Sequence, residues 1–267
     1  MNILILGDIF GIPGVEAIKK KLPKIIIRKK IDFVIANGEN AADNGLGITK
    51  KNAEDFFNAG INVITSGNHI WDQKETQNFI EKEKRLLRPE NSLKPVPGKG
   101  NNIFVANNKK KIAVINLMGN VFMKKTEDVF KTAQSTLKKL VLKKNIDFLI
   151  VDFHGETTSE KLACGYLFDG KATCVFGTHT HAPTSDTRIL KKGTAYQTDI
   201  GMCGDYDSVI GFNKENSLKK FQRDKDAIKN FPANGPGTIS GLIVTADTKT
   251  GLAKNIQRLK IGEHKEI

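Results

Sequence analysis

Two histidines stand one residue apart in the stretch CVFGTHTHAP, residues 174–183, directly after a short apolar run. In an extended His-x-His segment, alternate side chains point the same way, so His179 and His181 can face one site. Imidazole nitrogens together with carboxylate oxygens suit Mn, Fe or Zn better than Ca or Mg. The spacing therefore predicts that the two histidines bind metal, with one ion for each ring.

Four other apolar stretches end in polar side chains that can bind metal. They end at Asp8, at Glu39 and Asn40, at Asn68 and His69, and at His154. Ligands of α/β proteins bind at the carboxyl ends of the strands. Each cluster alone also fits a turn, a helix cap or a hydrogen-bonded core histidine. Four of the five histidines lie in these turns, however, which favours one shared site. The fifth, His264, lies in the charged C-terminal stretch, where we expect an exposed side chain without a role.

The carboxylates in these turns indicate a pair of metal ions. Asp8 and Glu39 supply negative charge, and a carboxylate that bridges two cations lowers the repulsion between them. Two metals about 3.5–4 Å apart are a common device for in-line attack at phosphorus. The cluster therefore predicts hydrolysis of a phosphate ester.

Short strands and intervening helices must position these residues. The predicted strands, each rich in Ile, Val or Phe, are Asn2–Leu6, Phe33–Ala36, Val63–Thr65, Lys111–Asn116, Phe148–Val151, Cys174–Phe176, Thr194–Gln197, Ile239–Thr245 and Ala253–Arg258. The predicted helices are Val15–Lys29, Thr49–Ala59, Lys74–Glu83, Glu127–Lys143 and Thr158–Cys164. The early part alternates strand and helix and the late part is mostly strand, which predicts a mixed α/β sandwich in one domain, residues 1–267. The Pro- and Gly-rich stretch 88–102 is predicted to be a loop.

The composition, with 39% hydrophobic and 27% charged residues, fits a globular protein. No apolar run approaches the roughly 18 residues of a membrane span, and Met1 leads directly into a strand-like segment without a signal peptide. We therefore expect a cytoplasmic protein without a membrane partner. The three cysteines, Cys164, Cys174 and Cys203, have no Cys-x-x-Cys spacing, which argues against a disulfide framework or a structural zinc cluster.

The net charge of +13 comes mainly from lysine, which makes up 36 of the 42 basic residues. Arginine is the residue that binds phosphate through two hydrogen bonds, and only six are present. One Trp and three Tyr also leave few surfaces for stacking bases. The charge therefore indicates solvated faces and some attraction for anionic substrates rather than a dedicated nucleic-acid surface.

A dinucleotide-binding site is one alternative, because a strand, a glycine-rich turn and a helix open the chain. The glycines run Gly7, Gly11 and Gly14, which is not the Gly-x-Gly-x-x-Gly pattern, and Asp8 would repel a pyrophosphate. This alternative leaves four histidines unexplained, and no Walker A sequence occurs. The pattern therefore argues against nucleotide-cofactor binding.

The ordered motifs resemble the calcineurin-like metallophosphoesterases, and within them the YmdB-type 2′,3′-cyclic-nucleotide phosphodiesterases. The segments that carry the resemblance are GDIFG, NGENAA, SGNHIWD, DFHGETTSEK, GTHTHAPTSD and TDIGMCGDYDSVIG, and the likeness runs from Met1 to about Val244. The resemblance implies a four-layer αββα sandwich of two mixed sheets with a dimetal site at the strand ends.

The resemblance also implies a role for each clustered residue. Asp8, Glu39, Asn40 and His181 would hold one metal, and Glu39, Asn68, His154 and His179 would hold the other, with Glu39 bridging. His69 would not be a ligand but a general acid that protonates the leaving oxygen. The wider superfamily has Asp-x-His where this chain has Asp8-Ile9-Phe10, and the amide oxygen of Asn40 would fill that vacancy. This departure leaves the metal open: we expect Fe, with Mn or Zn as alternatives.

The implied function is hydrolysis of 2′,3′-cyclic nucleotides, and of other phosphodiesters, by a hydroxide that bridges two metals. A broad-specificity phosphatase or phosphodiesterase and a metal-containing, RNA-associated regulatory protein stay open as alternatives. RNA ends or RNA-processing proteins are further candidate partners, as is a second copy of the chain. The stretch at residues 194–211 is expected at the rim of the substrate pocket.

Overall fold

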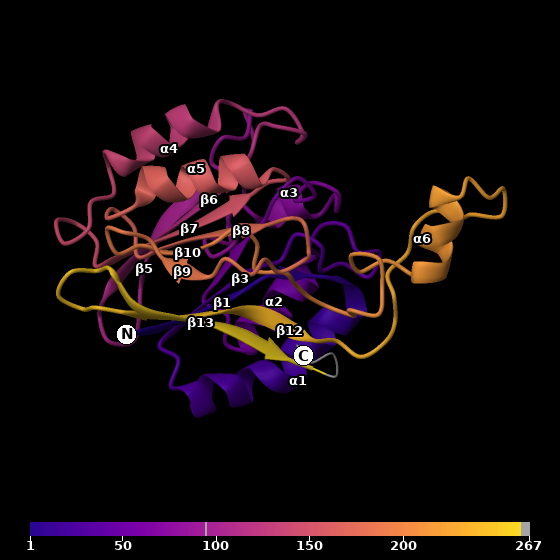
Figure 1. Ribbon diagram of the computed structural model, residues 1–267, viewed down its shortest axis with the longest axis horizontal. Helices are drawn as coiled ribbons and strands as arrows, with labels where there is room; N and C mark the ends of the chain where they lie inside the picture. Colours follow the sequence, from indigo (N-terminus) through magenta and orange to yellow (C-terminus); the bar gives the residue numbers. More distant parts are fainter. Residues whose placement is uncertain (94, 263–267) are drawn as a thin grey trace.

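Two mixed β-sheets lie face to face, and helices cover the outer face of each, as Figure 1 shows for the computed structural model. The structure describes residues 1–93 and 95–262, so the prediction for His264 lies outside the described residues. These four layers confirm the αββα sandwich that the resemblance implied.

The elements lie in the following order along the chain. The strands are β1 Asn2–Leu6, β2 Asp8–Ile9, β3 Phe33–Asn37, β4 Val63–Thr65, β5 Asn101–Val105, β6 Lys111–Met118, β7 Phe148–His154, β8 Cys174–Thr178, β9 Arg188–Ile189, β10 Ala195–Gln197, β11 Met202–Cys203, β12 Ile239–Ala246 and β13 Ala253–Ile261. The helices are α1 Gly11–Lys29, α2 Lys50–Asn58, α3 Thr76–Phe79, α4 Val129–Leu137, α5 Thr158–Phe168 and α6 Lys214–Phe221.

Both sheets are mixed: the first is antiparallel on one side and parallel out to its edge strand β4, and the second is parallel in the middle and antiparallel at both edges. The first sheet has the order β13-β12-β1-β3-β4, in which β1, β3 and β4 are parallel. The second has the order β5-β6-β7-β8-β10-β9, in which β6, β7, β8 and β10 are parallel. A separate short pair joins β2 to β11. The predicted site residues lie at the carboxyl ends of five of these parallel strands, β1, β3, β4, β7 and β8.

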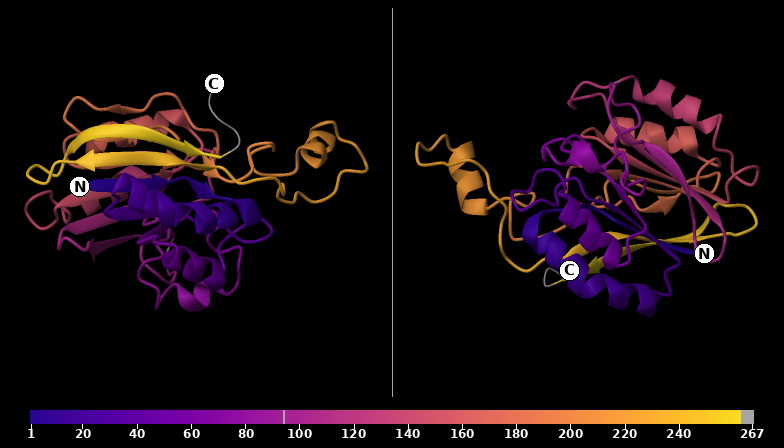
Figure 2. Two further views of the ribbon diagram at one scale, coloured as in Figure 1. Left: turned by 90° about the horizontal axis from the view of Figure 1, so that it is seen from below. Right: turned by 180° about the vertical axis from the view of Figure 1, so that it is seen from behind.

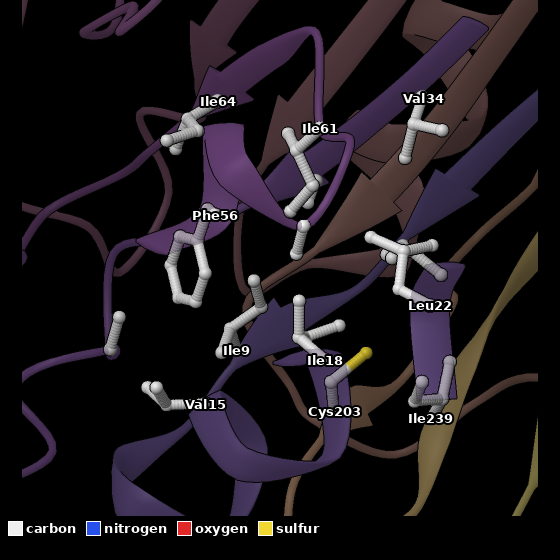
Figure 3. Packing of buried hydrophobic residues seen from close by; sticks show 14 of the residues in the cluster. Ile9, Val15, Ile18, Leu22, Val34, Phe56, Ile61, Ile64, Cys203 and Ile239 are labelled. Atoms are coloured by element: carbon white, nitrogen blue, oxygen red, sulfur yellow. The ribbon is translucent and has the colours of Figure 1, made fainter. Parts of the chain in front are cut away.

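Buried apolar side chains form three clusters, one between each pair of layers. Alternate residues of β1 belong to different clusters: Ile3 and Ile5 lie between the sheets, whereas Leu4 and Leu6 pack toward α1 and α2. Figure 3 shows this second cluster, with Phe56 of α2 facing the side chains of α1. Burial on both faces explains why these strands are almost continuously apolar in the sequence.

Several element boundaries differ from the prediction. The helix α1 begins at Gly11 rather than Val15, because Pro13 fits the first turn, where backbone N–H groups have no partner within the helix. The helix predicted at residues 74–83 is only the single turn α3, and the one predicted at 127–143 ends at Leu137. The helix propensity of the sequence predicted both helices to be longer than they are.

Five elements have no counterpart in the prediction, namely the two-residue strands β2, β9 and β11, the edge strand β5 and the helix α6. β5 is an edge strand whose residues are partly buried or exposed, so it lacks the apolar pattern of the inner strands. α6 begins after Asn213, whose side chain accepts a hydrogen bond from Asn216 N (2.9 Å). It lies on the segment between β11 and β12, which projects away from the sheets in Figures 1 and 2.

Within the described ranges, no helix is long and apolar enough to cross a lipid bilayer. The three cysteines are buried free thiols, as expected for small core residues.

The carboxyl ends of the parallel strands from the two sheets meet at one edge. The hydroxyl of Thr65, at the end of β4, donates to Asp152 Oδ2 near the end of β7 (2.5 Å). Ser66 N likewise donates to Asn116 Oδ1 of β6 (2.9 Å). These contacts close the sandwich at the edge that carries the predicted site.

Candidate metal centre

The eight predicted site residues all lie at this closed edge. Asp8 follows β1, Glu39 and Asn40 follow β3, Asn68 and His69 follow β4, His154 ends β7, and His179 and His181 follow β8. Residues at the carboxyl ends of five strands, three in the first sheet and two in the second, thus supply one site. Asp8, Glu39, Asn40, His154 and His181 are buried, and the other three are partly exposed.

Three of these side chains converge on one atom of a fourth, Nε2 of His154. Glu39 Oε1 lies 2.9 Å from it, Asn68 Oδ1 3.0 Å and His179 Nδ1 3.1 Å. Ligand atoms of Glu39, His154 and His179 all lie within 4.8 Å of one another. This group matches the set that the resemblance implied for one of the two metals.

The remaining side chains form an adjoining group. Asn40 Oδ1 lies 3.3 Å from His181 Nε2. Asp8 Oδ2 accepts a hydrogen bond from His179 N (3.2 Å), and Asp8 Oδ1 lies 3.8 Å from His154 Nδ1. In the described part of the chain, Asp8 Oδ1 is fully buried and has no hydrogen-bond partner. Buried polar atoms are almost always paired, so this oxygen fits a cation.

In His154 and His181, a hydrogen bond at Nδ1 leaves the lone pair of Nε2 free to face the site. The Thr178 hydroxyl donates to Asp152 Oδ1 (2.8 Å), so it accepts from His154 Nδ1 (2.9 Å) and leaves Nε2 free. His181 Nδ1 donates to the carbonyl oxygen of Ile210 (2.7 Å), again leaving Nε2 toward the site. Histidine ligands of metals are commonly fixed in this way.

Asn40 is oriented by the same principle. Its Nδ2 donates to the carbonyl oxygen of Gly45 (2.8 Å), so Oδ1 faces His181 Nε2 with no proton between them. Two facing acceptors repel each other unless a cation lies between them. The donor set therefore fits two metal ions.

The charges of the site lead to the same conclusion. Burial by itself lowers the pKa of His154, but the nearby carboxylates of Glu39 and Asp8 outweigh this effect and raise the pKa to about 9. Burial and the neighbouring His154 lower the pKa of His179 to about 3, which keeps that ring neutral. In the protein alone, a proton on His154 offsets buried negative charge that a metal ion would otherwise offset.

Close packing makes glycine necessary at residue 67. A Cβ atom there would lie 2.3 Å from both Glu39 Oε2 and His154 Nε2. These distances are far below van der Waals contact. A larger residue at position 67 would therefore displace the side chains of the predicted ligands Glu39 and His154.

The His-x-His segment is not extended, so that part of the prediction was wrong. His179 and His181 have φ values of 104° and 65°, in the left-handed region. Asp199 stabilises the turn between them, because its Oδ2 accepts a hydrogen bond from Thr180 N (3.1 Å). Lys161 of α5 pairs with the same oxygen (2.7 Å), and both side chains are 1% exposed.

Lys161 and Asp199 were not assigned a role from the sequence. Both lie in the motifs that carried the resemblance, but a lysine on a helix and an aspartate after a strand are common surface residues. Their pairing depends on contacts 38 residues apart, and no local pattern reveals it.

His69 lies beside the ligands without joining them. Its backbone N donates to Glu39 Oε2 (3.1 Å), and its ring Nδ1 contacts Asp72 Oδ2 (2.7 Å). The side chain is 27% exposed. Asp72 is a second residue that the sequence analysis did not assign, although it ends the motif SGNHIWD. An accessible imidazole with a carboxylate partner can exchange a proton with a bound molecule.

The chain is similar to known proteins over most of its length. A family model described as "YmdB-like protein" matches residues 4–259. The chain is 42% identical over 263 residues to the 2′,3′-cyclic-nucleotide 2′-phosphodiesterase of Bacillus subtilis, which covers 98% of each chain. It is 43% identical over 228 residues to a putative phosphatase/phosphodiesterase of Mycoplasma pneumoniae, covering 83% of this chain and 79% of that protein.

Solved structures show the same similarity. A crystal structure described as a novel phosphatase from Mycoplasma pneumoniae superposes with a TM-score of 0.90 at 36% identity, covering 98% of this chain and 93% of the other. A hypothetical protein from Thermus thermophilus superposes with a TM-score of 0.89 at 34% identity, covering 99% of this chain and 100% of the other.

Proposed function

The chain belongs to the YmdB-like protein family, and on this premise we propose that it is a two-metal phosphodiesterase that hydrolyses 2′,3′-cyclic nucleotides. The observation that carries the proposal is the buried carboxylate of Glu39, 2.9 Å from His154 Nε2, together with the adjoining acceptors Asp8 Oδ1, Asn40 Oδ1 and His181 Nε2. The name of the Bacillus subtilis relative supports the choice of substrate. We propose one metallophosphoesterase domain over residues 1–267, because strands from both ends of the chain build the first sheet.

We propose the ligand sets that the resemblance implied. Asp8, Glu39, Asn40 and His181 would hold one ion, and Glu39, Asn68, His154 and His179 the other. When bound, two such ions lower the pKa of a water between them and offset the negative charge that builds on the phosphate. Three imidazoles and two carboxylates suit Fe, Mn or Zn, and Fe is our first candidate.

His69 supplies the proton in this proposal. Asp72 accepts a hydrogen bond from Nδ1 and orients the ring, and Nε2 gives a proton to the ribose oxygen that leaves phosphorus. A new P–O bond forms to the oxygen of the attacking water as one ester P–O bond of the cyclic phosphate breaks, and the product is a nucleoside monophosphate. The backbone hydrogen bond from His69 to Glu39 keeps this ring next to the metals.

A comparison of three substrates tests the proposal on the metal-loaded wild type. We expect kcat/KM for 2′,3′-cyclic AMP to exceed that for 3′,5′-cyclic AMP and p-nitrophenyl phosphate by tenfold or more, a difference of about 1.4 kcal/mol in transition-state binding. Chelation of the metal should abolish all three activities. Equal rates on p-nitrophenyl phosphate would favour a broad phosphatase. Metal-loaded protein that hydrolyses none of the three would instead favour a regulatory role, with RNA ends or RNA-processing proteins as partners.

A further inference from the structure

A cavity of about 200 Å³ lies against the proposed metal centre, and we propose that it binds the nucleobase of the substrate. The inference rests on the proposed function, because it names the base-binding part of the same active site. Its lining includes the proposed ligand Asn68, the aromatic side chain Trp71 and two lysines, Lys124 and Lys125.

Three segments line most of the cavity at the closed edge of the sandwich. One follows β4 and contains Asn68 and Trp71, the second lies between α3 and β5 and contains Pro89 and Leu93, and the third follows β6 and contains Lys124. The first and third segments touch where Lys124 Nζ donates to the carbonyl oxygen of Asn68 (2.7 Å). The same ammonium lies 3.6 Å from Asp72 Oδ1, and Asp72 holds the ring of His69. The cavity is thus on the side of the metals where the proposed general acid lies.

The lining favours a flat, apolar group attached to an anion. Apolar side chains such as Trp71 and Met118 form most of it, and none of the described residues that line it carries a carboxylate. Four other cavities of the described chain, of about 390–830 Å³, each include at least one acidic side chain and none of the eight predicted site residues. A base stacks on an aromatic side chain, and two lysines suit the phosphate that accompanies it.

The volume limits what the cavity can hold. Pockets for drug-sized molecules are about 300–1,000 Å³, so about 200 Å³ suits one heterocyclic ring system rather than a whole nucleotide. The cyclic phosphate and ribose would therefore lie outside it, toward the metals. The expected pocket rim at residues 194–211 does not contribute to this cavity, and its role stays a prediction.

The first test uses the protein's own fluorescence. Trp71 is the single tryptophan of the chain, so its emission reports on this cavity without a label. We expect adenosine 3′-monophosphate to quench the emission of the metal-loaded enzyme in a saturable way, with much smaller changes for ribose 5-phosphate and inorganic phosphate. Equal changes with all three probes would overturn the inference.

The second test separates base binding from catalysis. Trp71→Ala should raise KM for 2′,3′-cyclic AMP about tenfold, and this rise should exceed that for methyl ribofuranoside 2,3-cyclic phosphate, which lacks a base. Because Trp71 also packs against the core beneath α1 and α2, Trp71→Phe keeps an aromatic face and should restore most of the affinity. Tyr166→Ala, which removes a 60% exposed aromatic ring from α5, is the matched control.

The outcomes distinguish this inference from the proposed function. If Trp71→Ala raised KM equally for the substrates with and without a base, the base site would be wrong and the phosphodiesterase would stand. If the wild type hydrolysed no cyclic phosphate, the proposed function would be wrong. The fluorescence titration would then still decide whether a base binds in the cavity.

Discussion

Glu39→Gln is expected to lower the turnover of 2′,3′-cyclic AMP by about 10²–10³-fold or more and to remove at least one metal ion per chain. Glutamine keeps the shape of the side chain but removes the charge that both proposed ions share. The change also replaces an oxygen next to His154 Nε2, now 2.9 Å away, by a group that can be an amide nitrogen. Metal content by atomic emission and kcat on the same samples measure both effects.

The matched control for this variant is Glu16→Gln, which changes an exposed carboxylate of α1 that pairs with Lys19 and Lys20. It should alter neither metal content nor kcat. A Glu39→Gln protein that kept two metals and turnover within tenfold of wild type would show that Glu39 does not bridge.

His69→Ala is expected to lower kcat on 2′,3′-cyclic AMP by about 10²–10⁴-fold while the protein keeps its metals. The hydrogen bond that reaches Glu39 comes from the backbone of residue 69, so alanine preserves it. The ring contacts Asp72 rather than the ligand atoms. In His69→Ala, kcat should therefore fall while metal content stays unchanged, whereas in Glu39→Gln both should fall.

The leaving group offers a sharper check on His69. A p-nitrophenolate leaves without needing a proton, so bis(p-nitrophenyl) phosphate should lose much less turnover in His69→Ala than the cyclic nucleotide does. Asp72→Asn should cause a smaller loss of turnover, because it weakens the hydrogen bond that orients the His69 ring. Equal losses on both substrates, or a loss of metal, would contradict the general-acid assignment.

The sequence alone predicted the inner strands and the site turns well, for a physical reason. Strands such as β7 and β8 are buried on both faces and therefore almost purely apolar, so their ends are visible where polar residues begin. Polar residues at the strand ends are therefore easy to recognise in the sequence, as the proposed ligands Glu39 and His154 are. Burial leaves a clear local signal.

Features set by long-range contacts could not be predicted. The left-handed backbone of His179 depends on the Asp199–Lys161 pair, which lies in distant segments. The edge strand β5 and the helix α6 lack a strongly apolar face, so the periodicity that marks inner elements is weak there. The contact between His69 and Asp72 could not be predicted either, because outside a helix a spacing of three residues does not determine whether two side chains meet.

The central claim, two metal ions that share Glu39, is tested most directly by anomalous scattering from crystals of the metal-loaded protein. We expect two peaks about 3.5–4 Å apart, one beside Asp8, Asn40 and His181 and the other beside Asn68, His154 and His179. Data on either side of the Fe, Mn and Zn edges would identify the element. A single peak, or two peaks away from Glu39, would contradict the account.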